Sequence, residues 1–191
     1  PLDELDRRLN KTREFNNRLY GKLDIKILPW LSYNTMFQYE YGVSRLKRLE
    51  EMESLNTRQT VNKFATNNNG EALYNLPADI FYTQEHHSNA YNFRQQINVD
   101  KTFNDLHNVT WIIGQEIRNT KLEYNSLTRY GYDSGLLSSQ YIDETKLTAG
   151  FSGLMNSWAS LTSPRSQSEL VNRFVSFYSN IAYSFDNRYT L

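Results

Sequence analysis

The sequence contains no cysteine among its 191 residues, which excludes disulfide bonds, thiol catalysis and cysteine-ligated zinc. Lysine and arginine total 21, as do aspartate and glutamate, so the formal net charge is zero and no nucleic-acid partner is indicated. No apolar run is long enough for a transmembrane helix, and the charged start PLDELDRRLN has no signal-peptide core. A helical membrane protein is therefore excluded, whereas a barrel strand needs only alternate apolar residues.

Aromatic residues make up 14% of the chain, and they lie in segments where polar and apolar residues alternate. A period of two is typical of β-strands with two different faces. The alternation predicts one hairpin over residues 19–42 around Pro29 and a second over 91–113 around Asn104-Asp105. A third begins at residue 174, turns at Asp186-Asn187 and resumes at Tyr189, with Leu191 inside the new strand.

Long connections alternate with these short turns. The connections are predicted at about residues 45–85 and 130–168, and short turns opposite long loops are the layout of an outer-membrane barrel. The spacing over residues 44–65 predicts a helical piece within the first loop, and residues 2–11 have a similar pattern. Neither segment indicates a separate domain.

Aromatic side chains also gather at both ends of the predicted strands, which are expected to be about ten residues long. Two such groups are typical of the girdles at the two interfaces of a membrane barrel. Those near the short turns are Trp30, Tyr33, Phe103, Trp111, Tyr183, Phe185 and Tyr189, and those near the long loops are Phe37, Tyr39 and Tyr41.

No catalytic or metal-binding group emerges from the titratable residues. His86 and His87 beside Glu85 are the residue types that bind metals, but neighbours in a strand point to opposite faces. His107 is interpreted as a turn histidine. Glu50, Glu51 and Glu53 lie among basic residues, as on a solvated helix. We therefore expect no enzyme, no metal and no cofactor.

The polar strand faces are the better candidates for function, because they would point into the lumen if the apolar faces meet lipid. They would pack against a plug or contact substrate. These residues are Lys22, Asp24, Lys26, Asn34, Gln38, Glu40, Arg94 and Gln96. The loop tyrosines could stack on sugars or peptide side chains, or seal against another protein. They are Tyr74, Tyr82, Tyr130, Tyr132 and Tyr141.

Four segments resemble the barrel of SusC/RagA-type TonB-dependent outer-membrane transporters of Bacteroidetes, from about Leu19 onward. They are the final stretch 173–191, the sequence LPWLSY at 28–33, HNVTWIIGQE at 107–116 and YGYD at 130–133. The resemblance implies an all-β, antiparallel up-and-down meander that forms part of a transmembrane barrel wall over residues 1–191. Long extracellular loops with short helical pieces would join about six strands.

The same resemblance implies active import of glycan fragments or peptides across the bacterial outer membrane. The implied partners are a SusD-like surface lipoprotein, TonB, outer-membrane lipid, and the plug and remaining barrel of the transporter, with no nucleic acid. No plug or TonB-contacting segment is recognised, so a partial barrel is expected. The alternative is a soluble all-β carbohydrate- or protein-binding module, in which the apolar faces of Ile25, Phe37 and Ile181 would form a core against a second sheet.

Overall fold

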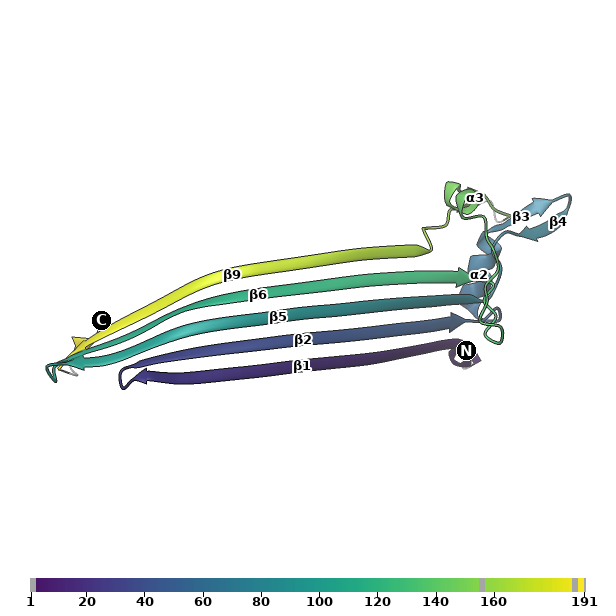
Figure 1. Cartoon of the computed structure of the whole chain (residues 1–191). Helices are drawn as coiled ribbons and strands as arrows, with labels where there is room; N and C mark the ends of the chain where they lie inside the picture. The colour runs from purple at the N-terminus through teal and green to yellow at the C-terminus, as the bar shows by residue number, and fades with distance from the viewer. Residues whose placement is uncertain (1–2, 155–156, 187–188, 191) are drawn as a thin grey trace. The chain divides into compact units, whose positions relative to one another are not determined.

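The computed structural model describes residues 3–154, 157–186 and 189–190. One six-stranded sheet dominates them, with neighbours in sequence order (Figure 1). Its strands are β1 (Arg8–Leu28), β2 (Leu31–Glu50), β5 (Ile80–Phe103), β6 (His107–Tyr130), β9 (Arg165–Phe185) and β10 (Tyr189–Thr190). The predicted antiparallel meander is therefore confirmed, and the other two sheets in the described residues have two strands each.

The short turns lie where the sequence predicts them. The first separates Leu28 from Leu31, and the second follows Phe103, with Asn104 and Asp105 in the left-handed region at φ 50° and 57°. Asparagine and aspartate tolerate that region better than most residues, which favours the turn. The third begins at Asp186, and Tyr189 pairs with Phe185 beyond it. Asn187 and Leu191 lie outside the described residues.

The long strands are about twice the predicted length. β1 and β9 have 21 residues each, β2 has 20, and β5 and β6 have 24 each, whereas about ten suffice to cross a bilayer. The two connections shorten correspondingly, to residues 51–79 and 131–164. The prediction was wrong here because it followed only the clearest apolar alternation, which is interrupted in the extensions, as at residues 44–50 with charged side chains on both faces.

The helical interpretation of residues 44–50 and 8–11 is also wrong, since both belong to strands. Cross-strand pairs explain the result: Ser44 donates to Glu14 Oε1 at 3.3 Å, and Arg8 Nη2 lies 2.8 Å from Glu50 Oε1. Within the two segments predicted to be helical, the helices are the shorter pieces α1 (Asp3–Asp6) and α2 (Leu55–Lys63). No helix in the described ranges has the length and apolar character to cross a membrane.

The chain divides into two compact units. The first comprises residues 1–15, 43–86 and 123–168, and the second comprises residues 16–42, 87–122 and 169–191. The first holds the helices and the two small sheets, which are the antiparallel pairs β3 (Ala65–Asn68) with β4 (Glu71–Tyr74) and β7 (Phe151–Ser152) with β8 (Trp158–Ala159). Helix α3 spans Glu144–Ala149.

The loops of the first unit share a small hydrophobic core. Its buried residues come from both long connections and from the end of β6: Phe64, Leu76, Tyr130, Leu147, Ala159 and Leu161. Backbone hydrogen bonds also join the two connections, with Leu154 N donating to Ala65 O at 2.9 Å. The two long loops therefore fold against each other instead of extending separately into solvent.

Candidate functional site

One face of the second unit is apolar and exposed. The side chains at odd-numbered positions of its strands include Ile25, Phe37 and Ile181, which are 42%, 43% and 64% exposed. Near the short turns this face becomes amphipathic: Trp111 Nε1 donates to Ser179 Oγ at 2.8 Å, and His107 Nδ1 lies 2.6 Å from the Tyr183 hydroxyl. The structure therefore presents an apolar surface bordered by aromatic groups with polar tips, as a lipid-facing wall requires.

The opposite face of the same unit is a network of polar side chains. Arg18 Nε lies 2.7 Å from Glu40 Oε1, and Lys22 Nζ lies 2.9 Å from Asp24 Oδ2. Asn34 then links neighbouring strands, because it donates to Asp24 and accepts from Asn98. The structure thus brings together most of the even-numbered residues that the sequence analysis assigned to the lumen.

Arg94 is the centre of a second group on this face. Its Nε donates to the Tyr178 hydroxyl at 2.7 Å and its Nη2 to Gln96 Oε1 at 3.2 Å, while Tyr178 donates to the same Gln96 oxygen at 2.9 Å. The guanidinium carbon also lies 5.0 Å from the centre of the Tyr178 ring. The tyrosine reaches this position by crossing β6.

Gly114 is what allows the crossing. A Cβ added there would overlap the Tyr178 ring and would lie 2.7 Å from the Gln95 carbonyl oxygen. Sequence reasoning did not find this contact, although a glycine inside a strand is a known sign of close approach by another group.

The polar face still has free hydrogen-bonding capacity. Asn92 Nδ2 donates to Glu116 Oε1 at 3.0 Å, but its Oδ1 is buried and unpaired within the described residues. Lys26 is exposed, and no side-chain partner is found for it in the described part of the chain. Such a face can hydrogen-bond a packed protein element or a polar ligand.

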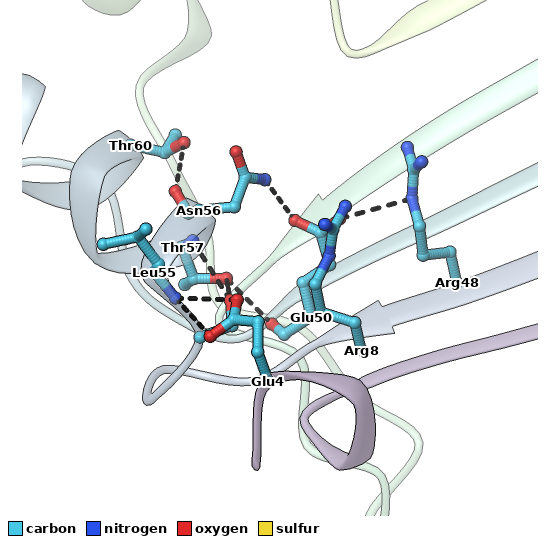
Figure 2. Close-up of polar contacts among 9 residues, drawn as sticks. Glu4, Arg8, Arg48, Glu50, Leu55, Asn56, Thr57 and Thr60 are labelled. Carbon is cyan, nitrogen blue, oxygen red and sulfur yellow. Dashed lines mark hydrogen bonds and ion pairs between the residues drawn. The ribbon is translucent and has the colours of Figure 1, made fainter. Parts of the chain in front are cut away.

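In the first unit, a polar cluster surrounds Glu50 (Figure 2). The Glu50 side chain is only 6% exposed, and its Oε1 lies 2.8 Å from Arg8 Nη2 and 3.5 Å from Arg48 Nε. Asn56 donates to its other oxygen. The expectation of a solvated helical face is therefore wrong for Glu50, which ends a strand and is held by two guanidinium groups.

Hydrogen bonds beside the Glu50 cluster also hold the N-terminus of α2. Ser54 Oγ caps the helix by accepting from Thr57 N at 3.2 Å, and Glu4 accepts from Leu55 N at 2.9 Å. Thr57 Oγ1 donates to the Glu50 carbonyl at 3.3 Å (Figure 2). An acidic group at a helix N-terminus is stabilising, so these contacts fix the first loop to the strand ends.

The tyrosines assigned to the loops have different positions. Tyr82 lies in β5, and Tyr132 stacks on Phe81 with ring centres 4.2 Å apart. Tyr130 belongs to the buried core, where burial and the nearby Glu144 carboxylate raise the pKa of its phenol. Only Tyr74 and Tyr141, which are 55% and 93% exposed, present open surfaces.

Two of the histidines pack against aromatic rings. His86 packs against Tyr124 with ring centres 4.9 Å apart and lies within hydrogen-bond distance of Gln84. Within the described residues there is no group of three or more histidine and acidic side chains that could hold a metal ion. His107 is the first residue of β6, directly after the second turn, and its ring centre lies 5.2 Å from that of Phe185.

Comparison with known proteins finds similarity to part of the length of outer-membrane receptors and transporters. No family model matches the chain. A relative, TonB-dependent receptor P39 of Formosa agariphila, is 25% identical over 139 residues, which is 73% of this chain and 12% of that protein. Two solved structures of the RagAB system, described as a peptide transporter and as a peptide importer in the closed-closed state, each cover 95% of this chain. Their TM-scores are 0.64 and 0.60, at 14% and 13% identity.

These similarities define the class as an all-β barrel wall, built as one antiparallel meander. The chain is similar to a wall segment of SusC/RagA-type TonB-dependent transporters, so the resemblance drawn from the four sequence motifs is confirmed. It spans 12% of the length of the curated relative and 17% of each structural neighbour.

Proposed function

We propose that the chain forms part of the wall of a TonB-dependent active transporter in the bacterial outer membrane. The observation that carries this proposal is the contrast between the two faces of one sheet, with Ile25 and Ile181 exposed on one side and the Arg94 network on the other. A face of exposed apolar residues is unfavourable in water and favourable against lipid.

Within that transporter, the polar face is proposed to line the lumen and to hydrogen-bond a plug. Import energised through TonB would require elements outside this chain, and a SusD-like lipoprotein is the proposed partner at the loop end. Peptides are favoured over glycan fragments as cargo because both RagAB structures are described as peptide transporters. No enzymatic step is proposed.

The soluble binding module, our alternative, requires a second sheet over the apolar face. The described residues contain only the six-stranded sheet and two two-stranded ones, so no element of the described chain supports that alternative.

The test is to determine which face of the sheet is covered by lipid. The chain has no cysteine, so single cysteines at Ile181 and at Asn34 can report on each face in an otherwise cysteine-free transporter. In intact outer membranes, a water-soluble maleimide should label the residue-34 variant and label the residue-181 variant only after detergent is added. Equal labelling at both positions in membranes, or recovery of the protein in the soluble fraction, would contradict the proposal.

A further inference from the structure

A hollow of about 560 Å³ lies within the first unit, and nothing in the proposed transport function uses it. Most of its lining comes from odd-numbered positions of β2, β5, β6 and β9. Phe81, Leu127 and Leu137 give it an apolar part, and Tyr132 stacks on Phe81 at its edge.

Its charged lining is strongly cationic: Arg45, Lys47, Arg129 and Arg165. Arg45 pairs with Glu85 at 3.1 Å, and Arg165 pairs with Glu144 at 3.2 Å. Four positive charges therefore face two carboxylates, which leaves an excess of two. Lys47 and Arg129 supply that excess, since neither has an acidic partner among the described residues, and both are exposed.

The position of these cations along the strands indicates which part of the surroundings they contact. The odd positions of β2 are mostly apolar or aromatic from Leu31 to Val43, and they change to cationic at Arg45 and Lys47. On β6 they change from Val109, Trp111 and Ile113 to the polar end that includes Arg129. On β2 the cations follow directly after the residues proposed to contact acyl chains, and on β6 Arg129 lies farther along, at the polar end of the same strand face.

We propose that this hollow binds the phosphorylated headgroup of an outer-leaflet lipid, an inference that rests on the proposed membrane location. Phosphate accepts from Lys47, Arg129 and the partly paired Arg45, while Phe81 and Leu137 contact the apolar atoms nearest the headgroup. A transported ligand is the less suitable occupant, because it would contact the even-numbered face.

The experiment uses the full transporter that contains this segment, purified from outer membranes in detergent. Binding of phosphorylated lipid A is measured by native mass spectrometry, alongside its dephosphorylated form and with inorganic phosphate as competitor. The test variant is the pair Lys47→Gln and Arg129→Gln. The control pair, Lys26→Gln and Arg118→Gln, removes the same charge from even-numbered positions.

Each cation near an anionic surface contributes roughly a fivefold gain in affinity, so the test pair should bind the phosphorylated lipid about 25-fold more weakly. The control pair and a charge-retaining pair, Lys47→Arg with Arg129→Lys, should bind as the parent does. Dephosphorylated lipid should bind the parent and the test pair equally.

Equal weakening by both glutamine pairs would overturn the proposal, as would tight binding of the dephosphorylated lipid to the parent. Full displacement by inorganic phosphate would identify a free-anion site instead and would also overturn it. These failures differ from failure of the proposed function, which would appear earlier as a protein absent from the outer membrane.

Discussion

At the residue scale, odd-numbered positions of the strands in the second unit carry mostly apolar side chains, and even-numbered positions of the same strands carry mostly polar ones. Ile25 and Ile181 present bare hydrocarbon, whereas Asn34 and Arg94 on the other face lie in continuous hydrogen-bond networks. Since adjacent side chains point to opposite sides of a strand, one substitution can be tested on each face at similar depth.

Aspartate at Ile25 or at Ile181 should reduce assembly in the outer membrane. The expected cost is up to about 2 kcal/mol, because a carboxylate would have to leave water and enter the apolar layer. Met36→Asp is the matched control, since it makes a similar change at an even-numbered position of β2. The measurement is the fraction of heat-modifiable, folded protein in isolated membranes, and equal losses on both faces would refute the assignment of faces.

Gly114→Ala should weaken the Arg94–Tyr178 contact, since the new methyl group would displace the tyrosine ring that crosses Gly114. The expected loss is more than about 1 kcal/mol, because the Gln95 backbone carbonyl must shift as well as the tyrosine ring. Tyr178→Ala removes both the hydrogen bond and the ring. Gly114→Ala should therefore cost less in the Tyr178→Ala background, as a double-mutant cycle on denaturant stability would measure. An unchanged cost would show that Gly114 acts through the Gln95 carbonyl and not through Tyr178.

At the scale of elements, the Glu50 cluster joins the first strand, the second strand and the first loop. Arg8 belongs to β1, Arg48 and Glu50 to β2, and Asn56 to α2 (Figure 2). Glu50 is buried, while both arginines remain partly exposed to water. If the carboxylate is lost, water can therefore hydrate the two guanidinium groups only in part. The cluster positions the base of the loop and needs no substrate to explain it.

Glu50→Gln should loosen α2 from the strand ends. A buried pair is costly to break, but the exposure of the arginines reduces the expected loss to about 1–3 kcal/mol. Glu53→Gln, whose carboxylate lies 3.6 Å from Arg7 on the surface, should cost less than about 0.5 kcal/mol. Hydrogen exchange of the amides of residues 55–63 measures the difference. Unchanged protection in the Glu50 variant would refute the role of the cluster.

The sequence predicted the order of the strands and their turns, because apolar alternation and the Asn104-Asp105 pair are local signals. It did not predict their lengths. Residues 44–50 have charged side chains on both faces, so the alternation disappears although Arg8 and Glu50 still pair across β1 and β2. The β3–β4 hairpin was also missed, although the Asn69-Gly70 dipeptide is a known signal for a tight hairpin turn. In the structure both residues have the positive φ values, 53° and 95°, that such a turn needs.

The polar face was predicted more fully than the loop end. Its residues share a strand parity that can be read directly, as in the Lys22–Asp24 and Arg94–Gln96 pairs. The loop core was not predictable, because Phe64 and Leu147 are brought together by contacts between two separate connections. Tyr130 was for this reason assigned to an exposed loop, whereas it is 8% exposed.

At the scale of the whole molecule, the sheet is open. Its order begins with β1 and finishes with β10, and neither edge strand has a second partner among the described residues. Backbone groups left unpaired in lipid cost several kcal/mol each, so a wall of this kind is stable in a bilayer only when other strands complete it. A sheet with an exposed apolar face and two open edges therefore requires additional strands to be stable in lipid.

Residues 1–191 expressed alone should not form a transport-competent unit in lipid. The proposed import would require a closed wall and a plug that can move, whereas the described residues form one open six-stranded sheet and two two-stranded sheets. The measurement is the flux of a labelled peptide into vesicles that contain the segment, compared with vesicles that contain the intact transporter. Vesicles with the segment should show no more flux than protein-free vesicles. Saturable uptake of the peptide by the segment alone would show that the six strands close and gate a pathway without further chain.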